Sequence, residues 1–372
     1  MKESRLVTSL VAGVCLSFLL ACGSGSGNSG TNGSGGGSTS GSIQSVNHVV
    51  VMIQENRSFD HYFGQLNQYR ASQGLSTGVD GMPANASNPN FEQNGTVSAF
   101  HLTTQCSEDL SPFWDSEKVD INLNNPTSST PLMNGFVWAA AHFARDENAA
   151  GVSPQYSDIE GHRAIGYYTS DDIGYYYFMA TQFGTSDRFF APVLTRSQPN
   201  HLYLYAATSQ GYVYPPTAQL TAKTIFQSLD AAKVSWKIYE TDPGANFLTY
   251  FTSASSEPAG NIVPATQFAT DAANGTLPSV AFIEGGYNSG RDEHPPNPIQ
   301  MGEAYVASLI NALVQSQSWK DSVFFLIWDE AGGFYDHVPP ASAVSPDGIA
   351  PMDLQPTDFP GDFTTTGFRI PM

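Results

Sequence analysis

Two strongly apolar segments that lie far apart in the chain constrain its fold more than any other feature. Residues 46–53 read VNHVVVMI and residues 322–328 read SVFFLIW. Runs of this length, rich in β-branched and aromatic side chains, are typical of strands buried inside a sheet. We therefore predict a strand at each segment, the first of them buried on both faces.

Helical and strand patterns alternate between these two segments. Residues 224–233 are predicted to form a helix, and residues 234–239 and 279–283 two short strands. Between residues 302 and 317, apolar side chains recur at helical spacing, at Val306, Leu309, Ile310, Leu313 and Val314. This alternation indicates an α/β fold in which a mostly parallel sheet lies between helices.

Acidic residues follow both apolar segments. Glu55 and Asn56 come just after the first, and Asp329 and Glu330 come directly after the second. In open α/β sheets the ligand binds beyond the carboxyl ends of the strands, and carboxylate and amide oxygens suit a hard divalent cation, or Zn²⁺ when His joins them. Either pair by itself is better explained by helix caps and turns. Two pairs, together with the sequence DEH at 292–294 after a third strand, favour a metal site.

Composition excludes several classes of protein. The chain has 15 Lys and Arg against 34 Asp and Glu, a net charge of −19, which argues against nucleic-acid binding. With 41% hydrophobic residues it can fill a large core. The stretch 74–131 is polar, rich in Asn, Ser and Pro and without periodicity, so we expect an insertion or cap rather than a separate domain.

The N-terminal residues have the pattern of a lipoprotein signal and tether. Residues 1–21 combine a basic start with an apolar run that is too short and too early for a spanning helix. The run ends in LLAC, which resembles the lipobox of bacterial lipoproteins and makes Cys22 the acylated residue. Residues 22–44, mostly Gly, Ser, Asn and Thr, are expected to be a flexible tether. The alternative is an ordinary signal peptide with a chance Cys.

This pattern predicts export across the inner membrane and a lipid anchor at the outer membrane or cell surface. Gly23 gives no sign of retention at the inner membrane. Once the signal is removed and Cys22 is acylated, Cys106 is the lone cysteine, so no intramolecular disulfide is expected. We expect a buried, unreactive thiol at Cys106 rather than a catalytic one.

Five motifs carry a resemblance to a known family. The long ones are HVVVMIQENRSFDHYFG at 48–64 and WDEAGGFYDHV at 328–338; the shorter ones are DRFF at 187–190, SQPNHLY at 197–203 and DEHP at 292–295. In this order they resemble the bacterial phosphoesterase family, which contains phosphatidylcholine-preferring phospholipases C and acid phosphatases. That family is similar in fold to the alkaline phosphatase superfamily, in which a mixed, mostly parallel sheet between helices carries metal at the strand ends.

The resemblance implies the residues of the site. The metal ligands would be Glu55, Asn56, Ser197, Asp329 and Glu330. Ser197 would also be the nucleophile, because a divalent metal lowers the pKa of a hydroxyl bound to it. His294 and His337 are candidates to protonate the leaving oxygen or to stabilise phosphate oxygens; each is alternatively a ligand or a structural partner. Thr195 is a rival nucleophile, but Ser197 has the family's spacing.

The implied activity is metal-dependent hydrolysis of a phosphoric ester through a phosphoserine intermediate. Substrates would be phospholipids or small phosphate esters, with diester and monoester both open, and the metal would be Zn²⁺, Ca²⁺, Mn²⁺ or Mg²⁺. Tyrosines in 167–178 would either cage a choline ammonium or, as we prefer, pack a helix against the sheet. The rival hypothesis is a non-catalytic, lipid-anchored surface protein that binds phospholipid headgroups.

The resemblance also concerns the end of the chain. We expect the phosphoesterase domain to occupy residues 45–372 and to be incomplete, because in the family a segment similar to GFRIP at 367–371 leads into a further strand.

Overall fold

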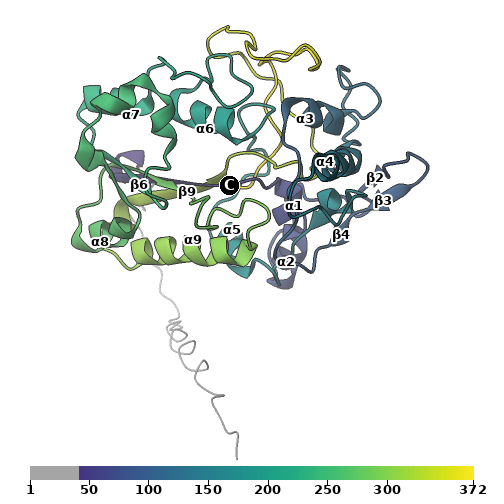
Figure 1. Ribbon diagram of the computed structural model, residues 1–372. Helices are drawn as coiled ribbons and strands as arrows, with labels where there is room; N and C mark the ends of the chain where they lie inside the picture. Colours follow the sequence, from purple (N-terminus) through teal and green to yellow (C-terminus); the bar gives the residue numbers. More distant parts are fainter. Residues whose placement is uncertain (1–41) are drawn as a thin grey trace, which may run out of the picture. The chain divides into compact units, whose positions relative to one another are not determined.

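A five-stranded parallel sheet forms the centre of residues 42–372, the part of the chain that the computed structural model describes (Figure 1). The strands lie in the order β7 (Ile262–Pro264), β6 (Trp236–Glu240), β8 (Val280–Glu284), β1 (His48–Gln54) and β9 (Ser322–Trp328). Every neighbouring pair is parallel. All the carboxyl ends of these strands therefore meet at one edge of the sheet, and β1 lies between two neighbours.

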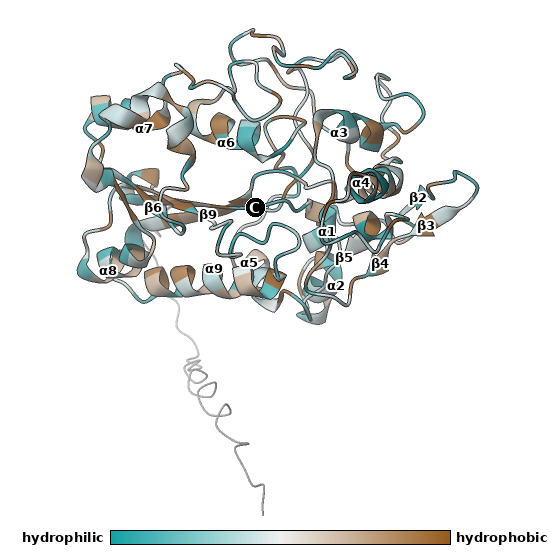
Figure 2. Cartoon of the chain, viewed as in Figure 1, coloured by the Kyte–Doolittle hydropathy of each residue, from teal (hydrophilic) through white to brown (hydrophobic). Residues whose placement is uncertain are grey.

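Helices cover both faces of the sheet. One layer holds α5 (Gly174–Gln182), α8 (Thr266–Asn274) and α9 (Ile299–Val314), and the other holds α6 (Ser197–Ala206) and α7 (Ile225–Ala232) (Figure 1). Separate buried clusters fill the two interfaces: Val50 packs with α8 and α9, whereas Phe282 packs with α6 and α7. Figure 2 shows brown, hydrophobic colour along β6 and β9 and mixed colour on the helices around them, as expected for this arrangement.

Local sequence explains the boundaries of these elements. Thr224 caps α7 through a reciprocal capping box with Gln227, which satisfies two free backbone N–H groups at the start of the helix. The apolar spacing predicted for the long helix is realised in α9, where Val306, Ile310 and Leu313 are buried. The mostly parallel α/β sheet between helices, predicted from the sequence, is confirmed.

The remaining elements lie beside the sheet (Figure 1). They are α1 (Phe59–Phe63), α2 (Leu66–Ser72), β2 (Ser87–Pro89), β3 (Thr96–Ser98), β4 (Phe100–His101), α3 (Trp114–Ile121), α4 (Phe136–Ala150) and β5 (Gly166–Tyr167). Short 3₁₀ turns occur at Ile43–Ser45, His162–Ile165, Phe247–Tyr250, Thr252–Ser256, Ala259–Asn261 and Trp319–Asp321. The polar stretch 74–131 belongs to the same compact unit, Ile43–Met372, and contributes Met82 and Leu110 to its third buried cluster.

The structure corrects one prediction and decides between two others. Cys106 is exposed, not buried, because it lies in the loop between β4 and α3, where its backbone N–H and C=O bond the Thr104 side chain. Tyr176 and Tyr177 are buried in α5 against the sheet, so these tyrosines pack a helix and do not form a cage.

The signal peptide, Cys22 and nearly all of the tether lie outside the described residues. Within residues 42–372, no helix has the length and apolar character needed to cross a membrane.

Candidate functional site

Three neighbouring strands end in buried acids. β8 ends at Glu284, Glu55 follows β1, and Asp329 follows β9; their exposed fractions are 4%, 9% and 2%. Because β1 lies between β8 and β9, these carboxylates share one edge of the sheet. Placing several like charges out of water is unfavourable unless something neutralises them. A group that compensates the negative charge of these carboxylates is therefore expected at this edge of the sheet.

Backbone contacts tie the ends of β1 and β9 together. The N–H of Asn56 donates to Asp329 Oδ1 (2.8 Å), and the N–H of Arg57 donates to the carbonyl of Glu330 (2.9 Å). Asn56 has a φ of 60°, in the left-handed region that Asn tolerates. Gly332 leaves room for it, since a Cβ at that position would lie 2.7 Å from the Asn56 Cβ. The two strand ends are thus held in one fixed geometry.

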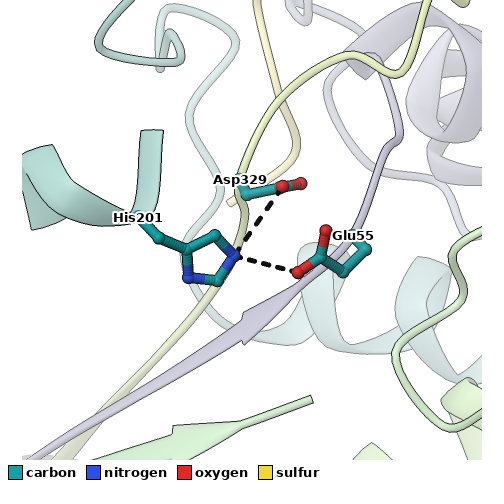
Figure 3. Close-up of side chains that lie close together, drawn as sticks. All are labelled: Glu55, His201 and Asp329. Atoms are coloured by element: carbon teal, nitrogen blue, oxygen red, sulfur yellow. Dashed lines mark hydrogen bonds and ion pairs between the residues drawn. The ribbon is translucent and has the colours of Figure 1, made fainter. Parts of the chain in front are cut away.

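His201 reaches this cluster from α6, in the helix layer that also holds α7. Its Nε2 lies 2.9 Å from Glu55 Oε1 and 3.7 Å from Asp329 Oδ2, and the three side chains point at one another (Figure 3). Its ring stacks on Phe247 with centroids 3.6 Å apart. Burial lowers the pKa of His201, which favours the neutral imidazole, the form that binds metals.

These three residues fit a divalent cation. One ligand atom from each of Glu55, His201 and Asp329 lies within 4.8 Å of the other two. Asp329 Oδ2 is buried without a hydrogen-bond partner. Burial raises the pKa of Glu55 to about 7, and burial followed by the charge of Glu55 raises the pKa of Asp329 well above its usual value. Two oxygens and one imidazole nitrogen are a common donor set for Zn²⁺ and other divalent ions.

Ser197 is the first residue of α6 and lies beside the same acids. Its Oγ is 3.3 Å from Asn56 Oδ1 and 3.5 Å from Glu330 Oε1. The structure therefore brings together all five residues that the sequence predicted as ligands. Thr195, the rival nucleophile, is fully buried, and its hydroxyl donates to the carbonyl of Val213 at 2.7 Å.

A cavity of about 380 Å³ opens onto Ser197. Arg196 and His294 line it together with Ser197. The Arg196 guanidinium lies over the ring of Phe113 at 4.8 Å and leaves its Nε without a hydrogen-bond partner. His294 Nδ1 contacts the carbonyl of Pro295 (2.7 Å), and its backbone N–H donates to Asp292 Oδ1 (3.1 Å), which fixes the ring at the cavity.

His337, the other predicted histidine, lies in a separate charge network. Its Nδ1 is 2.7 Å from Asp60 Oδ2 and its Nε2 is 3.2 Å from Asp80 Oδ1. Arg369 is fully buried in this network and donates to Asp60 Oδ1 at 2.9 Å. The structure thus brings His294, and not His337, to the cavity at Ser197.

Sequence reasoning did not assign a role to two residues of this site. His201 follows Ser197 by four residues on a helix, so both side chains lie on one face, and this spacing was available as a signal. Glu284 is the last residue of β8, in a position similar to that of Glu55 after β1 and Asp329 after β9. The Tyr205 hydroxyl donates to Glu284, and burial raises the pKa of that carboxyl.

Comparison with known proteins identifies the family of this α/β protein. The sequence profile of the Phosphoesterase family matches residues 46–372, and the chain belongs to that family. It is 30% identical over 336 residues to non-specific phospholipase C1 of Arabidopsis thaliana, covering 87% of this chain and 59% of that protein. It is 28% identical over 358 residues to phospholipase C A of Mycobacterium tuberculosis, covering 87% of this chain and 63% of that protein. The chain thus spans less than two thirds of these relatives.

Proposed function

We propose that this protein hydrolyses phosphoric esters with a bound divalent metal and with Ser197 as the nucleophile. The observation that supports this most is the position of the Ser197 hydroxyl. Ser197 lies at the start of a helix, lines a cavity, and is next to the buried Glu55, His201 and Asp329 cluster. The phospholipase C names of the relatives support a phospholipid or small phosphate ester as the substrate.

In this proposal Glu55, His201 and Asp329 hold the metal, with Ser197, Asn56 and Glu330 beside it. A bound divalent ion would supply positive charge that lowers the pKa of the serine hydroxyl and offsets charge on phosphate oxygens. Arg196 lines the cavity and its Nε has no hydrogen-bond partner, and no side chain caps the N-terminus of α6, where the helix dipole favours negative charge. Both favour an anion in front of Ser197.

The chemistry consists of two displacements at phosphorus, the first by Ser197 and the second by water. Ser197 Oγ attacks phosphorus and passes its proton to the Glu330 carboxylate, whose Oε1 is 3.5 Å away. The bond from phosphorus to the leaving alcohol breaks, and His294, which lines the same cavity, donates a proton to that oxygen. Water then attacks the phosphoserine and passes a proton to His294, the bond from phosphorus to Ser197 Oγ breaks, Glu330 returns its proton to that oxygen, and the phosphate product is released.

The test is hydrolysis of p-nitrophenyl phosphate and p-nitrophenyl phosphocholine, each with and without a chelator. We expect turnover that the chelator abolishes and that Ser197→Ala reduces by about 10⁴-fold or more in kcat, as for other covalent nucleophiles. Thr195→Ser, which keeps the buried hydroxyl bond to Val213, is the matched control and should retain most activity.

Two outcomes would contradict the proposal. Absence of hydrolysis of either ester would instead support the non-catalytic headgroup-binding protein. Near-normal rates for Ser197→Ala would exclude this residue as the nucleophile.

We also propose that Cys22 carries a lipid that holds the protein at the outer membrane or cell surface. This proposal rests on the sequence of residues 1–44. Cys22 itself lies outside the described residues. Cys22→Ser should move the protein from the membrane fraction to the soluble fraction. Unchanged membrane partition of that variant would contradict the anchor.

A further inference from the structure

Glu293 is a buried carboxyl group that the proposed chemistry does not use. It lies in the loop between β8 and α9, directly before His294, and its exposed fraction is 0%. Gly302 in α9 makes room for this side chain, because a Cβ at that position would collide with Glu293 Cγ. A carboxylate that leaves water is destabilised unless hydrogen bonds replace those it made to water. We therefore expect Glu293 to be held by specific donors.

Four side chains from four elements donate to this carboxylate. Oε1 accepts the hydroxyl of Tyr176 in α5 and Nε2 of Gln54 at the end of β1 (3.4 Å). Oε2 accepts the hydroxyl of Tyr62 in α1 (2.7 Å) and Nε1 of Trp328 at the end of β9 (3.3 Å). Burial raises the pKa of Glu293 to about 7, and the hydrogen bonds from the two tyrosines act in the opposite direction. Four donors suit the ionised form, which only accepts hydrogen bonds.

The backbone of the same loop is also tied to the strand ends. Glu293 has a φ of 72°, in the left-handed region that is uncommon for residues other than Gly and Asn. Its carbonyl accepts an N–H of the Arg57 guanidinium, and the carbonyl of Asp292 accepts the N–H of Glu55 (2.8 Å). An uncommon conformation persists only where its surroundings enforce it, and here both the side chain and the backbone are held.

The position of His294 depends on this attachment. Its Nδ1 contacts the carbonyl of Pro295 and its N–H donates to Asp292 Oδ1, so both hydrogen bonds connect it to its own loop. Its ring contact with Tyr287, with centroids 5.2 Å apart, is also within the segment between β8 and α9. The distance from the His294 ring to Ser197 is therefore set by how this loop is attached to the sheet, and Glu293 supplies four of the attachments.

We propose that Glu293 is a positioning residue that keeps the His294 ring within reach of the leaving oxygen. This inference rests on the function proposed above, in which His294 protonates that oxygen. Glu293 acts through His294 and does not touch the substrate. Displacing a reacting group by about 1 Å can cost about 100-fold in rate. The loss should be largest for leaving groups that need an acid, because general acid catalysis is what the displaced ring would fail to supply.

The test compares leaving groups in the full chain loaded with metal. p-Nitrophenolate leaves without a proton, whereas the glycerol alkoxide needs one, so glycerol phosphate is paired with p-nitrophenyl phosphate and glycerophosphocholine with p-nitrophenyl phosphocholine. We expect Glu293→Gln to lower kcat for the glycerol ester by about 10- to 100-fold and for its nitrophenyl partner by less than about threefold, with KM nearly unchanged. His294→Asn should show the same preference, and adding Glu293→Gln to it should cause little further loss.

Two further variants separate this role from a general effect on the fold. Glu303→Gln is the matched control: Glu303 is a half-buried carboxylate that accepts the N–H groups of Tyr175 (2.8 Å) and Tyr176 (3.3 Å) in α5, and its loss should affect the two esters equally and weakly. Tyr176→Phe removes one donor to Glu293 but keeps the ring. It should cause a smaller loss with the same preference for the glycerol ester, which tests the proposal even if Glu293→Gln folds poorly.

A second measurement needs no turnover. The proton–nitrogen NMR signals of the His294 ring, assigned by their absence in His294→Asn, should shift or broaden in Glu293→Gln and stay in place in Glu303→Gln. If neither ester of a pair is hydrolysed by the parent, the proposed function fails, and these signals still decide whether Glu293 positions the ring.

Three results would overturn the inference. They are equal losses for the two esters in Glu293→Gln, the same leaving-group preference in Glu303→Gln, and unchanged His294 ring signals in Glu293→Gln. In each case hydrolysis of the esters by the parent would still support the proposed function.

Discussion

Two buried clusters in this protein contain the same kinds of residue but balance their charge differently. The first holds Glu55, His201 and Asp329, and the second holds Asp60, Asp336 and His337. In both, a carboxylate pair and a histidine lie close enough to hold a metal ion. We call them the strand-end cluster and the Arg369 cluster.

An arginine makes the difference between them. Arg369 is fully buried in the second cluster, where it donates to Asp60 Oδ1 at 2.9 Å and lies 3.1 Å from Asp336 Oδ1. Among residues 42–372, the strand-end cluster forms ion pairs with no cation other than His201, and Asp329 Oδ2 has no hydrogen-bond partner. Residue types and spacing therefore do not define a metal site by themselves. Uncompensated buried charge is the feature that favours one.

The largest effect is expected in the strand-end cluster. Asp329→Asn keeps the Oδ1 that accepts the N–H groups of Asn56 and Glu330 but removes the charge. We expect metal binding to weaken by at least about 100-fold, with a comparable loss of activity, since even residues behind the ligands contribute 10- to 100-fold. The metal-free variant should be no less stable than the metal-free parent, because one of several like charges is gone. Elemental analysis and urea unfolding measure the two effects.

The control for this prediction is in the Arg369 cluster. Asp336→Asn should leave the metal content unchanged and lower stability, because it removes a partner of Arg369. Loss of metal from Asp336→Asn and not from Asp329→Asn would reverse the assignment of the two clusters.

Removing the arginine should have the next largest effect. Even with Arg369 present, burial and the charge of Asp60 raise the pKa of Asp336 to about 7. Arg369→Met would leave both carboxylates without their cation, so we expect the free energy of unfolding to fall by about 3–5 kcal/mol. Arg188→Met is the control: its side chain is 54% exposed and pairs with Asp80, so the loss should stay below about 1 kcal/mol. Equal effects of the two substitutions in urea unfolding would contradict this account.

Metal itself should stabilise the protein, by a smaller amount. A ligand that binds only the folded state adds about 2.7 kcal/mol at a concentration 100 times its Kd. A thermal scan with Ca²⁺, Zn²⁺, Mn²⁺ or Mg²⁺ in turn should show a higher Tm for the ion that binds. The same ion should not change the Tm of Asp329→Asn. A shift that persists in that variant would place the ion elsewhere.

The smallest effect concerns His337 and pH. Burial alone lowers the pKa of His337, but the hydrogen bond and charge of Asp60, with the charge of Asp336, outweigh burial and the charge of Arg369, so the pKa is raised. A raised folded pKa means that the protonated form stabilises the fold. This contribution is complete below the unfolded value of about 6.5 and is lost as the pH rises through the folded pKa.

The measurement is the difference in unfolding free energy between the parent and His337→Gln from acid to alkaline pH. We expect the largest difference below pH ~6.5 and a smaller one above the folded pKa. A difference that grows with pH would show that His337 acts as a neutral group.

Much of the fold was predictable because local sequence determines it. The strand predicted at 322–328 is β9 (Ser322–Trp328), and the strand predicted at 46–53 overlaps β1 (His48–Gln54). The positions of Glu55 and Asp329 after these strands predicted that they would meet, because parallel strands share their carboxyl edge. The order of strands within the sheet was not predictable from these patterns, since it depends on packing between distant segments.

The sequence by itself determined the strands, the helices that alternate with them, the acids at their ends and the serine before Pro199-Asn200. Tertiary structure alone decided that His201 joins the acids, that His294 lies at the cavity and His337 does not, and that Arg369 neutralises Asp60. Arg369 is 309 positions from Asp60. Local patterns reflect the periodicity of helices and strands, whereas compensation of buried charge depends on which side chains the fold brings within a few ångströms.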